Sequence, residues 1–113
     1  MNPGDVVLVP LPQVGSSLTK LRPALILSLL PGPYQSILIC GISTQLHHLR
    51  KDWDELIEPA DADFAGRGLH AASVIRLSYL YAAVPTEIAG VIGSVNPSRL
   101  DRLLTHLADH LHP

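Results

Sequence analysis

The chain has 113 residues, of which 47% are hydrophobic, and this is enough for the core of one domain over residues 1–113. Its net charge of −2 argues against a protein that coats nucleic acid non-specifically, because such proteins carry a basic excess. The apolar runs are too short to cross a membrane, no signal segment is evident, and the single cysteine cannot form an internal disulfide, so we expect a cytoplasmic protein.

Alternating or β-branched apolar runs predict six strands, over residues 5–9, 24–30, 36–43, 53–58, 73–80 and 87–95. Pro10 should end the first strand, and the proline, glycine and serine residues of 11–21 predict a loop. The Pro31-Gly32-Pro33 turn favours an antiparallel hairpin between the second and third strands. Gly90 and Gly93 should produce bulges in the last strand.

Two irregular segments are expected between these strands. Residues 44–51 are polar and predict a loop, and residues 59–72 show no period and should cross over the sheet. In the short strand between them, Trp53 and either Leu56 or Ile57 should face inward. Cys40 lies in an apolar run, which favours an inert buried thiol.

The last segment changes to a helical period. One apolar stripe is formed by Leu100, Leu103, Leu104, Leu107, Ala108 and Leu111. Asn96 is a suitable N-cap, and Pro97 suits the first helical position. Short strands followed by one helix predict a mainly β fold, a small, strongly bent sheet or barrel with a C-terminal α-helix.

The charges of the two halves differ. Residues 1–51 carry four cations and one acid, a net +3, whereas residues 52–113 carry four cations and nine acids, a net −5. An anion-binding face should therefore come mainly from the first half, although chance clustering on a solvated surface accounts for the charges equally well.

Four histidines and the single tryptophan are further candidate site residues. His106 and His110 have metal-ligand spacing on the helix, but they lack a third ligand, and a solvated face is favoured over a metal site. His47 or His48 could move a proton near neutral pH, although unpaired surface histidines are common. Trp53 could stack on a base, but a role as a core anchor is favoured.

Arg22 and Ser43 form the strongest candidate pair. Arg22 opens the second strand and Ser43 closes the third, so antiparallel pairing would bring them to the same end of the sheet. A guanidinium beside a hydroxyl can bind a phosphodiester and stabilise the charge of a pentacovalent transition state. From spacing alone, a strand-end arginine and a turn-capping serine explain the pair more simply.

At these residues the sequence resembles the MazF/PemK family of toxin endoribonucleases. The similar blocks are residues 4–10, 20–28 (KLRPALILS) and 42–45 (ISTQ), followed by 73–77 and 93–111. The resemblance covers nearly the whole chain and implies an SH3-like small barrel that forms a homodimer. It also implies the toxin of a type II toxin-antitoxin system, held silent by a cognate antitoxin whose flexible segment covers the RNA site.

The resemblance further implies cleavage of single-stranded RNA without a metal ion or cofactor, by attack of the RNA 2′-hydroxyl on the adjacent phosphorus. Arg22 matches the catalytic arginine of the family, and Ser43 stands where threonine is usual. The residues expected to bind RNA are Gln13, Ser16, Ser17, Thr19, Lys20, Thr44 and Gln45. Two alternatives are an SH3-like toxin or adaptor that binds a protein such as a topoisomerase, and a module that binds RNA without cutting it.

Overall fold

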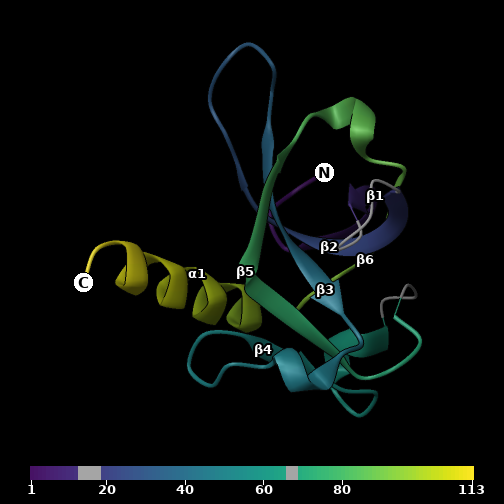
Figure 1. The fold of residues 1–113 in the computed structure, drawn as a ribbon, viewed down its shortest axis with the longest axis vertical. Helices are drawn as coiled ribbons and strands as arrows, with labels where there is room; N and C mark the ends of the chain where they lie inside the picture. Colours follow the sequence, from purple (N-terminus) through teal and green to yellow (C-terminus); the bar gives the residue numbers. More distant parts are fainter. Residues whose placement is uncertain (13–18, 66–68) are drawn as a thin grey trace.

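The structure is a computed structural model that describes residues 1–12, 19–65 and 69–113 (Figure 1). Its main elements are β1 (Asp5–Pro12), β2 (Thr19–Leu29), β3 (Ile37–Ser43), β4 (Glu55–Ile57), β5 (Ser73–Ala83), β6 (Gly90–Ser94) and α1 (Pro97–Leu111). Within these ranges the strands form one curled antiparallel sheet in the order β4-β5-β3-β2-β1-β6, and its open ends make it a half-barrel. The predicted mainly β fold with a C-terminal helix is confirmed.

The β2–β3 hairpin is also confirmed, with Ala24 opposite Gly41 and Leu29 opposite Ile37. Figure 1 shows this hairpin projecting beyond the rest of the sheet. The segments predicted to be irregular over 44–51 and 59–72 contain the short 3₁₀ helices η1 (Leu46–His48) and η2 (Ala62–Ala65), and a further one, η3 (Pro85–Glu87), lies between β5 and β6.

The first two strands are longer than predicted. β1 continues to Pro12, and β2 begins at Thr19, so the predicted loop over 11–21 is wrong at both ends. β6 pairs with β1 only as far as Leu8, which leaves the end of β1 with β2 as its one neighbour among the described strands. Proline is tolerated there, because an edge position needs no N–H on its open side.

The later strands also differ in their limits. β4 is confined to Glu55–Ile57, whereas β5 continues past the predicted end to Ala83. β6 begins only at Gly90, because the preceding residues form η3. The expected irregularity of β6 is present, since Val6 pairs with Gly93 and Val7 with Val91, leaving one residue between them without a partner on β1.

A bulge in β5 bends the sheet beside β3. Cys40 pairs with Leu80, but its neighbour Gly41 pairs with Arg76, so residues 77–79 stand opposite no residue of β3. The polar groups of this bulge are bonded elsewhere. The N–H of Leu77 donates to Asp54 Oδ1 at 2.9 Å, and the Trp53 indole N–H donates to Ser78 Oγ at 2.8 Å. The bulge is therefore a stable part of the fold.

Apolar side chains are buried on both faces of the sheet. One cluster lies beneath α1 and includes Leu25, Ile75 and Leu103, and the other, on the opposite face, includes Val9 and Ile39. Cys40 belongs to the first cluster, and burial raises the pKa of its thiol to about 12. The predicted inert thiol agrees with this environment.

Helix α1 begins as predicted, because Asn96 Oδ1 accepts from the N–H of Ser98 at 3.0 Å and Pro97 is the first helical residue. Its apolar stripe is only partly covered. Leu103 and Leu107 are buried, but Leu111 is 71% exposed, since the last turns extend beyond the sheet (Figure 1). Within the described residues, no helix is both long and apolar enough to span a membrane.

Candidate active site

The antiparallel hairpin places Arg22 and Ser43 at the same end of the sheet. The β2–β3 ladder ends where Ala24 pairs with Gly41, and both residues lie two positions beyond that pair. They line one pocket of about 340 Å³. The lining residues are Leu11, Pro12, Arg22, Gly41, Ile42, Ser43, Gln45, His48, Arg76 and Tyr79. The structure therefore brings the two predicted residues together.

The pocket depends on the bulge in β5. A Cβ atom at position 41 would lie 3.2 Å from Cγ of Tyr79, so glycine allows this ring to lie against β3. The Tyr79 hydroxyl donates to the carbonyl of Pro12 at 3.4 Å. The Tyr79 ring thus connects the end of β1 to β5. The register shift at the bulge also places Arg76 opposite Gly41.

Ser43 caps a turn and keeps a free donor. Its Oγ accepts from the N–H of Gln45 at 3.0 Å, which is the turn-capping role that the spacing suggested. A hydroxyl can accept this bond and still donate its own proton. Ser43 can therefore bind an anion in the pocket without giving up its structural bond.

Two further residues line the pocket: Arg76 of β5, which was not predicted, and His48 of η1, for which the sequence left proton transfer and an ordinary surface position both open. Both are half-buried, and Arg76 Nε and His48 Nδ1 are buried without a hydrogen-bond partner in the part of the chain that the structure describes. Arg76 is the only charged residue between 73 and 83, and a lone charge in a strand is a signal that could have identified it.

The electrostatics of the pocket act on His48. Burial lowers the pKa of its imidazole below the usual range, and the nearby charge of Arg76, together with His47 and Arg50, lowers it further, while Asp54 opposes the shift. The rings of His47 and His48 meet edge to face with their centroids 4.4 Å apart. His48 is therefore mainly neutral at pH 7.

The other predicted RNA-binding residues divide into three groups. Gln45 lines the pocket, and Thr44, beside Ser43, is exposed outside it. Thr19 and Lys20 are exposed on β2 opposite Pro12 and Leu11, at the same end of the sheet. The remaining three lie outside the described residues: Gln13, Ser16 and Ser17.

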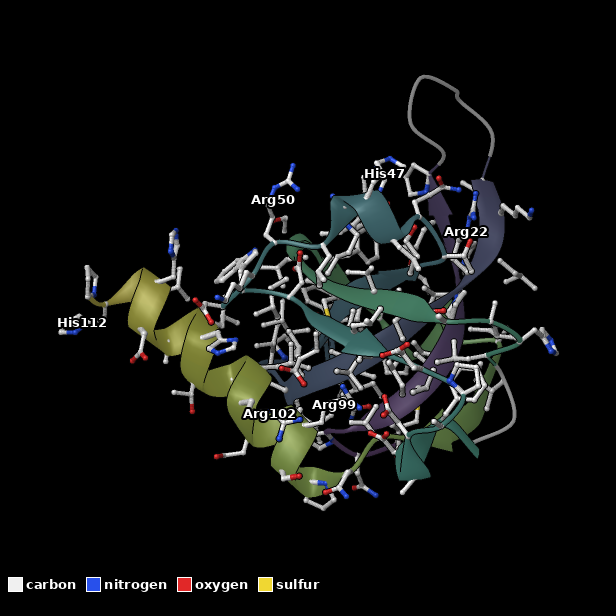
Figure 2. All side chains as sticks on the ribbon, turned by 90° about the horizontal axis from the view of Figure 1, so that it is seen from below. Arg22, His47, Arg50, Arg99, Arg102 and His112 are labelled. Carbon is white, nitrogen blue, oxygen red and sulfur yellow. The ribbon has the colours of Figure 1, made fainter. Side chains whose placement is uncertain are left out.

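Four arginines of the described chain lie in two contrasting settings. Arg22 and Arg50, with His47 between them, follow one edge of the molecule in Figure 2, and neither arginine has a carboxylate partner in the described ranges. Arg99 and Arg102 lie on the opposite side of that view, and both are paired with carboxylates. The free positive charge therefore gathers on the side of the pocket.

The prediction of a solvated face for His106 and His110 is wrong in part, because both pack against Trp53. His106 Nδ1 lies 3.2 Å from the carbonyl oxygen of Trp53, and the His110 ring centroid is 4.9 Å from that of the indole. In the described ranges no group of three or more metal-binding side chains comes together. These histidines hold α1 against residue 53.

The fold is thus a mainly β half-barrel with a terminal helix, and at one end of its hairpin lies a pocket lined by two arginines and a serine. The sequence model of the family described as PemK-like, MazF-like toxin of type II toxin-antitoxin systems matches residues 2–111. The chain belongs to this family of toxins.

Comparison of structures agrees on the fold. The Mycobacterium tuberculosis toxin MazF-mt6 superposes with a TM-score of 0.67 at 18% sequence identity, over 95% of each chain. Among curated proteins, no sequence matches this chain.

Proposed function

We propose that this toxin is an endoribonuclease that cleaves single-stranded RNA at the pocket between β2, β3 and β5. The observation that carries the proposal is the convergence of Arg22, Arg76 and Ser43 on one pocket, with no carboxylate among its lining residues. Two guanidinium groups without a counter-ion suit a phosphodiester, which brings the missing negative charge.

The chemistry follows from these groups. The RNA 2′-oxygen attacks the adjacent phosphorus, and the bond from phosphorus to the 5′-oxygen breaks, leaving a 2′,3′-cyclic phosphate and a 5′-hydroxyl. Arg22 and Arg76 neutralise the charge that develops on the phosphorane, and the Ser43 hydroxyl donates to one of its oxygens. DNA is not cleaved, because it lacks the 2′-hydroxyl. The guanidinium groups supply the positive charge, so we expect no requirement for a metal ion.

The test is incubation of the purified protein with a long single-stranded RNA in EDTA, beside a DNA of the same sequence. Arg22→Ala should lower the cleavage rate by about 10²–10³, the usual effect of removing one transition-state donor. Arg102→Ala is the matched control, because it removes an arginine that pairs with Glu55 outside the pocket. An intact RNA across varied sequences would refute the nuclease, whereas equal cutting by Arg22→Ala would refute only the site.

If the RNA is bound but stays intact, the protein is a non-cleaving RNA-binding module. If it is not bound at all, a toxin or adaptor with a protein target such as a topoisomerase becomes the better explanation.

We also propose a cognate antitoxin and a homodimer, acting in the cytoplasm. A flexible acidic segment of the antitoxin would cover the free cations beside the pocket and block RNA. Exposed apolar side chains on the strands, including Leu29, Leu80 and Val91, offer surface for a second copy. Light scattering should give twice the mass of the chain at micromolar concentration, and a monomer would contradict the dimer.

A further inference from the structure

His48 is held at the pocket by a fixed turn. It ends η1, where its N–H donates to the carbonyl of Gln45 at 3.0 Å. The buried carboxylate of Asp54 fixes the segment that follows η1. It accepts hydrogen bonds from the N–H of Arg50 and from the N–H of Leu77, both at 2.9 Å. Because Leu77 lies in the β5 bulge, one carboxylate fixes η1 to the strand that carries Arg76. The imidazole is therefore positioned by the fold.

The ring of His48 lacks the bonds of a structural histidine. Buried polar atoms in folded proteins are nearly always hydrogen-bonded, and an exception often marks a functional group. Nδ1 of His48 is buried without a partner in the described chain, and the same ring lines the pocket beside Arg22 and Ser43. No carboxylate or carbonyl of the described residues bonds to this nitrogen, so its hydrogen-bonding capacity is available to a substrate.

We propose that His48 is the general base of the reaction, an inference that rests on the proposed function. A nitrogen of its ring takes the proton from the RNA 2′-hydroxyl as the 2′-oxygen forms its bond to phosphorus. The bond to the 5′-oxygen breaks, that oxygen takes a proton from water, and the imidazolium then releases its proton to solvent. Arg22 holds the phosphate while this transfer occurs.

The charges around His48 favour this role over that of a general acid. Four groups face it from the elements packed around it, Arg76 of β5, His47 of η1, and Arg50 and Asp54 of the segment that follows. Arg22 shares the pocket from β2. Cations outnumber the single carboxylate, so the ring is neutral at pH 7, as a base must be.

This arrangement predicts a definite pH profile. The value of kcat/KM reports the pKa of the free enzyme. Because burial and then Arg76 lower the pKa of His48 below 6.5, the rate should rise with pH through a midpoint below 6.5 and stay level at neutral pH. Titration of the His48 ring by NMR in the wild-type protein should give the same midpoint. A mismatch between the two midpoints would overturn the assignment and does not depend on the folding of a variant.

Substitution completes the test. His48→Gln should cut RNA about 10²–10⁴ times more slowly, the usual contribution of a general base, and should lose the acidic limb of the profile. His47→Gln, which removes the neighbouring exposed ring, should keep the acidic limb and most of the rate, with the midpoint at a higher pH because His47 lowers the pKa of His48. Equal rates and profiles in His48→Gln and wild type would overturn the proposal.

A modified substrate separates base from acid. When sulfur replaces the bridging 5′-oxygen, the thiolate leaves without a proton, so a defect in a general acid disappears. His48→Gln should remain as defective on this RNA as on the natural one. Recovery of the rate would overturn the assignment as base, whereas a wild-type protein that cuts neither RNA refutes the proposed nuclease itself.

Discussion

Arg22 and Arg99 are the same kind of residue in opposite surroundings. Arg22 is exposed at the pocket, with no carboxylate partner among the described residues. Arg99 is buried on α1 and is bound by three carboxylates, one at the start of β4 and two in the crossing that follows it. Nε lies 2.7 Å from Asp63, Nη2 lies 3.2 Å from Asp61 and Nη1 lies 3.1 Å from Glu55 Oε1. An arginine therefore stabilises the fold where its charge is satisfied, and it is available to a ligand where its charge is not.

Removing Arg99 should have the largest effect on stability. Arg99→Met keeps much of the apolar stem but leaves the largely buried carboxylate of Asp63 without its arginine, and Glu55 with Arg102 alone. We expect a loss of about 3 kcal/mol, because breaking a buried ion pair leaves uncompensated charge. The melting temperature should fall by more than about 10 °C. Arg22→Met is the control and should have the melting temperature of the wild type. If the wild type, Arg99→Met and Arg22→Met all had the same melting temperature, the contrast between the two arginines would be contradicted.

The second-largest effect should be a loss of stability in acid, through protonation of Asp63, which pairs with Arg99. Burial alone would raise the pKa of Asp63, but hydrogen bonds from Arg99 and from the N–H of Asn96 hold it below its usual value. A carboxyl with a lowered folded pKa stabilises the protein above its unfolded pKa, about 3.9, and this stability is lost as the pH falls through the folded value. Urea unfolding at pH 7, 5 and 3 should show this loss.

Asp63→Asn is the variant that isolates the pH effect. It should be less stable than the wild type at pH 7 and should lose less stability on acidification, because the titrating group is gone. A parallel loss in both proteins would assign the acid sensitivity to other carboxylates.

The smallest effect should come from single surface cations. Lys20→Ala should lower the slope of RNA affinity against salt concentration by about 1, since one phosphate contact is lost. Arg102→Ala removes an equal charge from the opposite side, where the arginine pairs with Glu55 at 2.9 Å, and should leave the slope unchanged. If Lys20→Ala and Arg102→Ala had the same slope, RNA would not bind along the side of the molecule that carries the pocket.

Local signals predicted the elements that depend on neighbours in the chain. The cap at Asn96, the period of α1 and the turn between β2 and β3 are set within a few residues, and the hairpin brought Arg22 and Ser43 together. Arg76 was not predicted and His48 was not distinguished from His47, because their place at the pocket depends on a bulge that displaces β5 by three residues against β3. No local pattern in the sequence reports such a shift.

Burial of Arg99 was missed for a related reason. A charged residue on a helix normally faces solvent, and its partners Glu55 and Asp63 are 44 and 36 positions away along the chain. Chance clustering on a solvated surface was one of two explanations that the sequence left open for the acidic excess of the second half. Part of this acidic excess consists of the carboxylates that bind the guanidinium of Arg99. The arginines without a carboxylate partner are found on the other side of the molecule, beside the pocket.

Trp53 gives the molecule a built-in optical reporter. It is the only tryptophan of the chain, it donates to the β5 bulge, and it is followed directly by the carboxylate that fixes the turn of His48. On its other side the indole lies against His110 of α1. Because indole emission depends on the groups that surround the ring, the fluorescence of this one tryptophan reports both the packing of α1 and the geometry behind the pocket. RNA or antitoxin binding can thus be followed without attaching a dye.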